Sequence, residues 1–239
     1  MKEFLFIGLP YAAIATFIFG FWARYKRMPF TVSSLSSQFV EGRVLFWGSV
    51  PFHFGLLFVF AGHLIALFLP SVILGWNADP TRLFILEATG VIMSIGLLLG
   101  LVRLFHRRIT NDRVRVVTTR MDISVEILLI AQVVLGIWTA VGYRWGSSWF
   151  AADMTPYLWS IFTFSPDASV VSEMPLVVQL HVIGAWLLLL LIPFSRLGHF
   201  MVAPLDYIAR PYQQVMWHWN KNTIRDPNTP WSEARPKNN

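Results

Sequence analysis

Apolar stretches recur along the chain, each about as long as the 20 apolar residues that a helix needs to cross a lipid bilayer. Five such stretches lie at about residues 4–23, 46–69, 83–103, 121–143 and 174–202. Three acidic residues interrupt them: Glu87 in the third, and Asp122 and Glu126 in the first turns of the fourth. The pattern predicts an all-α integral membrane protein in which residues 1–210 form a five-transmembrane-helix bundle.

Composition supports a membrane protein and limits the cofactors that it can hold. Hydrophobic residues make up 55% of the chain and charged residues 13%, with a mean hydropathy of +0.55, whereas soluble proteins have about 25% charged residues. Without cysteine, the chain forms no disulfide, no cysteine-ligated iron–sulfur cluster and no covalent haem attachment. Residues 211–239 are polar and rich in proline, so we expect a cytoplasmic tail that is either docked on a partner or disordered.

The basic residues predict the orientation of the bundle. Sixteen of the nineteen lysines and arginines fall in three places: the connection after the first stretch, the segment from Arg103 to Arg120, and the segment from Arg196 onward. Short loops rich in lysine and arginine stay cytoplasmic. We therefore expect the N-terminus outside and the C-terminus in the cytoplasm. The net charge of +6 is then a topology signal and indicates no nucleic-acid partner.

Four of the six histidines lie in two of the predicted spans. His53 and His63 are in the second, and His181 and His199 are in the fifth, which runs in the opposite direction. His53 and His199 should therefore share the inner level, and His63 and His181 the outer level. One histidine from each helix at each of two levels is the arrangement that holds two stacked haems between neutral imidazoles.

Helix geometry fits this arrangement only with some distortion. The eighteen residues from His181 to His199 return to the same helical face after roughly 27 Å, whereas the ten from His53 to His63 advance roughly 15 Å and end about 80° out of register. Pro193 removes a backbone hydrogen bond between the two later histidines. We expect a kink there, together with helix tilt, to absorb the difference.

Other interpretations of these residues stay open. An intramembrane histidine also serves as an interhelical hydrogen-bonding group or as part of a proton path. Small residues beside the histidines favour a slot for a flat cofactor, although they also let helices pack closely; they are Gly55, Ala61, Gly62, Ala66, Gly184, Ala185, Gly198 and Ala203. His106 and His218 lie in polar or basic segments, and we leave both out of the site.

The charged groups near the spans also have two interpretations. Arg107, Arg108, Arg113 and Arg115 either pair with haem propionates or only enforce topology. Glu87, Asp122 and Glu126 are either interhelical hydrogen-bonding groups or groups that handle protons.

Three segments of the sequence resemble one known family. They are "PFHFGLLFVFAGH" (51–63), "RVRVVTTRMDI" (113–123) and "QLHVIGAWLLLLLIPFSRLGHFMVAPLDYIARPYQ" (179–213). They resemble the cytochrome b, or gamma, subunit of membrane-bound respiratory nitrate reductase. The likeness covers nearly the whole chain, and the motif "PFSRLxH" followed by "PxxY" is its most specific part.

The resemblance implies two non-covalent b-type haems: a distal haem held by His63 and His181 near the outer face, and a proximal haem held by His53 and His199 near the cytoplasm. It implies quinol as the substrate, drawn from the quinone pool in the plasma (inner) membrane. It implies that electrons pass to an iron–sulfur beta subunit and then to a molybdenum alpha subunit, which reduces nitrate. The chain would also anchor that complex to the lipid bilayer.

Two departures from the family affect the quinol pocket, which we expect near Gly62, His63, Ala66 and Arg82. The family's lysine before the third span has no counterpart, and Arg82 is the nearest basic residue. The family's glycine three residues after the distal ligand is Ala66 here. Rival functions are a cytochrome b of a nitrite-oxidising complex with reversed electron flow, one of a sulfite- or heterodisulfide-reductase system, and a haem-free membrane anchor or proton transporter.

Overall fold

The structure is a computed structural model that describes residues 1–28, 31–33, 36–38 and 40–202. In these ranges the regular elements are all helical, and they are, in chain order, η1 (Phe4–Gly8), α1 (Leu9–Arg27), α2 (Arg43–Phe68), α3 (Pro70–Asn77), α4 (Pro80–Thr110), α5 (Asp112–Val116), α6 (Arg120–Gly142), α7 (Gly146–Trp149), η3 (Phe150–Met154), α8 (Thr155–Phe162), α9 (Ser169–Glu173), α10 (Leu176–Leu191), η4 (Ile192–Phe194) and η5 (Arg196–Val202). The predicted tail at 211–239 lies outside the described residues.

Five helices in the described part are long and apolar enough to cross a membrane, which confirms the predicted number of spans. They cover Phe4–Arg27, Arg43–Phe68, Pro80–Thr110, Arg120–Gly142 and Leu176–Phe194. Local signals explain several of their ends. The Asp79 side chain accepts hydrogen bonds from the backbone N–H groups of Thr81 and Arg82 at the start of α4, and Thr119 and Asp122 form a capping box at the start of α6.

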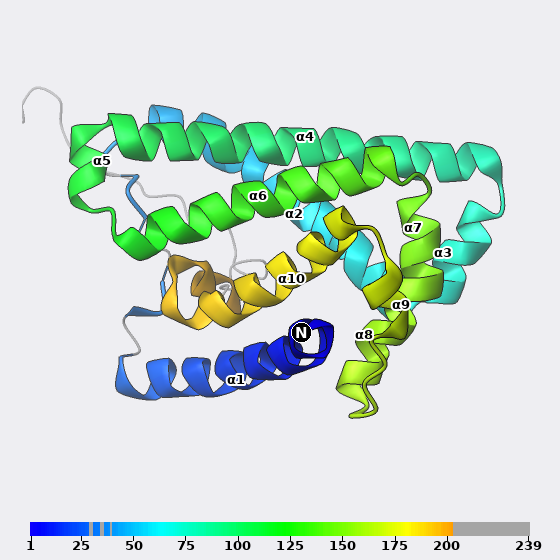
Figure 1. Cartoon of the computed structure of the whole chain (residues 1–239). Coiled ribbons are helices and arrows are strands. Elements are labelled where there is room, and N and C mark those ends of the chain that lie inside the picture. The colour runs from blue at the N-terminus through cyan, green and yellow to red at the C-terminus, as the bar shows by residue number, and fades with distance from the viewer. Residues whose placement is uncertain (29–30, 34–35, 39, 203–239) are drawn as a thin grey trace, which may run out of the picture. The chain divides into compact units, whose positions relative to one another are not determined.

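The spans pack in the order α2, α4, α6, α10 and α1. Figure 1 shows α4, α6, α10 and α1 following one another, with α2 behind α4. The closest approach is between α2 and α4, where glycines face the other backbone. A Cβ on Gly100 would lie 2.6 Å from the Phe52 nitrogen, and one on Gly55 would lie 2.7 Å from the Met93 oxygen. These glycines let the two helix backbones come into contact.

One prediction about the fifth span is wrong. The sequence predicts a span that continues to residue 202, but α10 ends at Leu191, and the chain goes on as the short 3-10 turns η4 and η5. Pro193 lacks the N–H that would continue the helix, and Ser195 adopts an extended conformation with φ −110° and ψ 175°. His199 therefore lies on a non-α segment, so the helical register counted from His181 does not apply to it.

Short helices close the opposite end of the bundle from α5 (Figure 1). α7, η3 and α8 follow α6, and their buried residues form a core with η1 that includes Phe6, Met154, Tyr157 and Ile161. The Tyr157 hydroxyl donates a 2.8 Å hydrogen bond to the Phe6 carbonyl, and burial raises the pKa of Tyr157 to about 12. These helices, together with α9, make up the connection between the fourth and fifth spans.

Candidate functional site

The inner pair of histidines comes together in the structure. The ring centroids of His53 on α2 and His199 on η5 lie 6.3 Å apart, with 70° between the ring planes. Two metal–imidazole bonds of about 2.0–2.1 Å, each extended by about 1.1 Å from nitrogen to ring centre, would separate two centroids by about 6.3 Å. The spacing of these rings therefore fits one ion bound between them.

The outer pair is also brought together. His63 and His181 lie close enough for the charge on one to act on the other. His63 packs against the ring of Phe150 in η3, with centroids 5.1 Å apart, so the helices after α6 cover the outer level. The two histidines of each pair thus lie near each other, although α2 and α10 are not neighbours in the helix order. Their pairing as ligands stays a prediction.

Each of the four imidazoles is held through Nδ1 by a backbone carbonyl. The accepting oxygens are those of Ser49 for His53 at 2.8 Å, Val59 for His63 at 2.8 Å, Gln132 for His181 at 3.1 Å and Arg196 for His199 at 2.8 Å. A carbonyl only accepts, so Nδ1 carries the proton in each ring, and a neutral ring then presents Nε2 as a lone-pair donor. Four histidines held in this tautomer are suited to bind metal through Nε2.

The set of ligands fits haem better than a bare metal ion. Among the described residues there is no group of three or more histidine, cysteine, aspartate or glutamate side chains arranged to hold a metal. Two imidazoles at each level supply only two ligands, and a porphyrin supplies the other four. The residues present therefore fit two haems, each with one imidazole on either side.

Gln132 of α6 is a site residue that the sequence analysis missed. Its backbone carbonyl accepts from His181, and its side-chain amide donates a 2.9 Å hydrogen bond to the His181 carbonyl. It is a lone amide in an apolar stretch of α6, which is the signal that could have indicated it. The two bonds fix His181 from a helix other than its own.

The expectation that the small residues share one cofactor slot is wrong for several of them. A Cβ on Gly55 would meet α4, one on Gly184 would lie 2.3 Å from Oε1 of Gln132, and one on Gly198 would lie 3.0 Å from the Phe21 ring. These three glycines therefore serve helix packing. Ala61, Gly62 and Ala185 stay exposed, and Ala203 lies outside the described residues.

The four residues expected at the quinol pocket have different surroundings. His63 and Gly62 are exposed, and a Cβ on Gly62 would meet nothing within 4 Å. Ala66 is buried, and its carbonyl accepts a hydrogen bond from Thr155 of α8. The guanidinium of Arg82 lies 5.5 Å from the Trp76 ring centroid.

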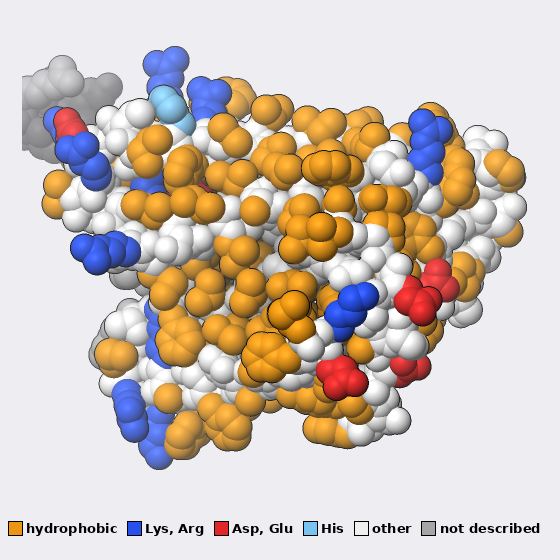
Figure 2. All heavy atoms as spheres, in the orientation of Figure 1, with side chains coloured by type: hydrophobic (Ala, Val, Ile, Leu, Met, Phe, Trp, Pro, Cys, Tyr) orange, Lys and Arg blue, Asp and Glu red, His pale blue; other side chains and the backbone are white. Residues whose placement is uncertain are grey.

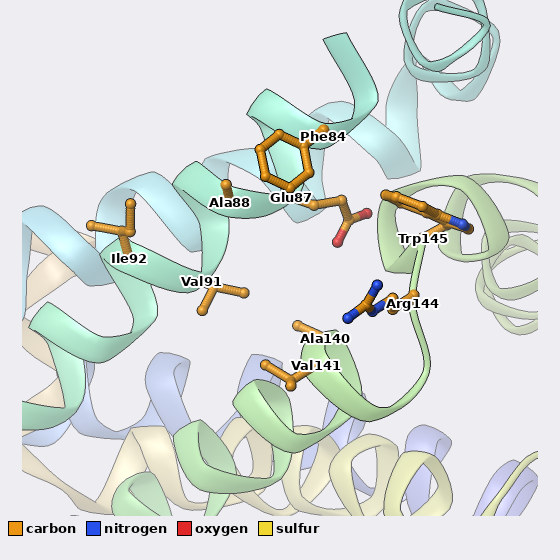
Figure 3. A pocket seen from close by; sticks show the side chains of 9 residues that line it. All are labelled: Phe84, Glu87, Ala88, Val91, Ile92, Ala140, Val141, Arg144 and Trp145. Carbon is orange, nitrogen blue, oxygen red and sulfur yellow. The ribbon is translucent and has the colours of Figure 1, made fainter. Parts of the chain in front are cut away.

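A cavity of about 360 Å³ opens between α4 and α6 near the α6–α7 turn. Its lining is mostly apolar, with Glu87 and Arg144 on opposite sides and Trp145 beside them (Figure 3). Oε1 of Glu87 accepts from the backbone N–H and the hydroxyl of Ser147, at 2.8 and 2.6 Å. Glu87 is thus a hydrogen-bonding group between α4 and the turn, which is one of the two roles that the sequence allowed.

The arginines near the α5 end of the bundle bind acidic side chains of the chain itself. Arg107 is buried and donates a 2.6 Å hydrogen bond to Glu41, and Arg108 donates a 2.8 Å bond to Glu126. Arg115 pairs with Asp112 at 3.0 Å. For Arg107 and Arg108 these contacts support a structural role over one as partners of propionates. His106 is exposed, and His218 lies outside the described residues.

Comparison with known proteins gives one consistent family. The family model described as "Nitrate reductase gamma subunit" matches residues 2–218. The chain is 32% identical to the respiratory nitrate reductase 2 gamma chain of Escherichia coli (strain K12), over 90% of this chain and 96% of that protein. It is 31% identical to the nitrate reductase gamma chain of Bacillus subtilis (strain 168), over 85% and 93%. It is also 33% identical to the nitrate reductase-like protein NarX of Mycobacterium tuberculosis (strain ATCC 25618 / H37Rv), but covers 33% of that longer protein.

Proposed function

The chain belongs to the nitrate reductase gamma subunit family, and from this premise we propose that it is a di-haem membrane cytochrome b that oxidises quinol. His63 and His181 bind the distal haem, and His53 and His199 bind the proximal haem. Electrons leave toward an iron–sulfur beta subunit and a molybdenum alpha subunit on the cytoplasmic face. The N-terminus lies outside, and the chain anchors the complex in the plasma membrane.

The observation that carries the proposal is the geometry of His53 and His199. Their centroid separation of 6.3 Å fits one ion between two imidazoles, and both Nδ1 atoms are already occupied by carbonyls. The outer pair repeats the same hydrogen-bonding pattern. A histidine that relays protons needs to exchange the proton of either nitrogen, so four rings fixed in one tautomer favour ligation over a proton path.

Quinol oxidation takes place near the outer face, and electron transfer carries the electrons toward the cytoplasmic face. When bound, the haems supply one-electron redox centres. Quinol binds beside Gly62, where an added Cβ would meet no atom within 4 Å, next to His63, and Arg82 provides a positive charge at the same end of the bundle. The quinol loses two protons to the outside and two electrons, one at a time, toward the inner pair. Each electron that crosses a membrane potential is worth about 2.3 kcal/mol per 100 mV.

The basic face beside α5 suits docking of the partner subunits. Lysine and arginine side chains gather at the end of the described part where α1 ends and α5 lies, whereas acidic side chains gather at the opposite end (Figure 2). Arg113 and Arg120 are exposed there, and among the described residues neither forms an ion pair.

Two measurements test the proposal: the haem content of the purified chain and the identity of the subunits that co-purify with it. We expect two low-spin b haems per chain, together with iron–sulfur and molybdenum subunits and quinol-dependent nitrate reduction. His63→Ala should remove one haem and quinol oxidation, and His199→Ala the other haem, with the chain still inserted. His106→Ala is the matched control and should keep both haems. A wild-type chain without a low-spin spectrum, or a His63→Ala chain that keeps both haems, contradicts the proposal.

A further inference from the structure

The inner ligand His199 lies on a segment with little helical support of its own. α10 ends at Leu191, and the residues that follow form the 3-10 turns η4 and η5 around an extended Ser195. A 3-10 turn has poorer hydrogen-bond geometry than an α-helix. Contacts from other helices must therefore fix the orientation of the His199 ring.

One residue of this segment connects His199 to α6. The carbonyl of Arg196 accepts the hydrogen bond from Nδ1 of His199 at 2.8 Å. The guanidinium of the same arginine donates to the Val117 carbonyl at 2.6 Å and lies 3.0 Å, from Nε, from Oδ1 of Asp122. Arg196 is thus held at its side chain by the α5–α6 junction, while its backbone holds the imidazole.

The carboxylate of Asp122 is held in place by contacts of its own. It is 8% exposed, and its Oδ2 atom accepts a 2.8 Å hydrogen bond from the backbone N–H of Thr119 in the capping box of α6. A guanidinium of Arg108 lies 3.7 Å from the same oxygen. Because Oδ2 has its partners at the start of α6 and on α4, the position of the whole carboxylate is set by those helices and not by the η5 segment.

We propose that Asp122 is a positioning residue for the proximal haem ligand, acting on His199 through Arg196. The proposal rests on the proposed function, because it takes His199 to bind a haem. The second partner of a ligating histidine fixes its ring orientation and raises its basicity, and loss of such a partner typically weakens metal binding by about 10- to 100-fold. Here that partner is the Arg196 carbonyl, whose place depends on the bond between Arg196 and Asp122.

The test compares Asp122→Asn with Glu126→Gln in the purified complex. Asparagine keeps an acceptor for Thr119 but removes the charge that holds Arg196. Glu126 is the matched control, because it is similarly buried, at 6% exposed, and pairs with Arg108 at 2.8 Å. Both changes remove one negative charge from the same cluster, so a purely electrostatic or structural effect should appear in both.

The readouts are the low-spin g-values of the proximal haem, which report the orientation of the imidazole planes, and the rate of haem transfer to excess apomyoglobin. We expect Asp122→Asn to shift the g-values of the proximal haem and to speed its loss about 10-fold or more. The distal haem should be unchanged, and Glu126→Gln should resemble the wild type in both readouts. If Asp122→Asn does not accumulate, Arg196→Lys gives the same comparison, because lysine keeps the charge but loses the two-pronged contact.

The outcomes separate the two proposals. A wild-type complex that lacks a haem sensitive to His199→Ala overturns the proposed function. A wild-type complex with that haem, in which Asp122→Asn and Glu126→Gln behave alike, overturns only the positioning role of Asp122.

Discussion

Gly136 of α6 lies against the imidazole of His181 of α10: a Cβ on this glycine would be 3.0 Å from Cε1 of the ring and 3.7 Å from Nε2. The same helix holds the ring one turn earlier through the Gln132 carbonyl. α6 therefore fixes the His181 ring twice, by a hydrogen bond and by the absence of a side chain at Gly136. Neither contact involves α10, the helix that carries His181.

We expect Gly136→Val to displace the His181 ring and weaken the distal haem. Forcing extra methyl groups into a packed site costs about 1–3 kcal/mol, which corresponds to roughly 5- to 150-fold weaker binding. The measurement is the haem-to-protein ratio with the spectrum of the remaining haem. Gly96→Val is the control, since a Cβ on Gly96 would meet nothing within 4 Å. Equal haem loss in both variants would mean that the ring is not sensitive to this contact.

The crossing of α2 and α4 should tolerate no side chain at Gly100. A Cβ there would lie 2.6 Å from the Phe52 nitrogen and 2.7 Å from the Gly48 oxygen, so the backbones must separate. We expect Gly100→Ala to lower the free energy of unfolding by about 1–3 kcal/mol, measured by denaturation in mixed micelles. Gly90→Ala provides the comparison, because the space around Gly90 is open. An unchanged unfolding curve for Gly100→Ala would show that the helices are less close than described.

Arg24 of α1 should stabilise the break after α10. Its guanidinium donates 2.7 Å hydrogen bonds to the carbonyls of Pro193 and Ser195, groups that a continuous helix would have bonded itself. Arg24→Gln removes the charge-assisted bonds, so we expect a loss of about 1.5–3 kcal/mol in the free energy of unfolding and faster loss of the proximal haem. Arg27→Gln, at an exposed position of the same helix, should cause neither change.

Glu41 should make the stability of the chain depend on acid pH. The backbone hydrogen bond from Val44, together with the bond from Arg107, lowers the pKa of Glu41 from its ordinary value of 4.5. A carboxyl group whose pKa is lower in the folded state stabilises the fold above its unfolded pKa, and that contribution is lost as pH falls through the folded pKa. We therefore expect the stability difference between wild type and Glu41→Gln to be largest at neutral pH and to shrink below about pH 4.5. A stability difference between the two proteins that stays constant across this pH range would contradict the lowered pKa of Glu41.

Several features could be predicted from the sequence because they depend on residue type and spacing. The five spans follow from the lengths of apolar sequence, and the pairing of histidines by depth follows from the antiparallel direction of two spans. The sequence places the end of the fifth span too far along the chain, because it treats Pro193 as a kink within a continuing helix. In the structure α10 ends at Leu191, and Ser195 beyond it is extended.

Other features could not be read from the sequence. The sequence alone does not distinguish the glycines near the histidines from one another. In the structure Gly55 faces α4, whereas Gly62 faces open space. The roles of Gln132 and Gly136 depend on the rotation of α6 toward His181. The cavity beside Glu87 and Arg144 forms where α4 and the α6–α7 turn meet (Figure 3).

The sequence by itself determined that five stretches are long and apolar enough to cross a membrane and that four histidines lie in or next to two of them, because hydropathy and residue spacing are properties of one segment at a time. Only the tertiary structure decided which ring faces which, and which carbonyl holds each Nδ1 atom. Those contacts depend on how each helix is rotated and where it ends relative to its neighbours. That rotation is set by close packing between residues that lie far apart in the chain.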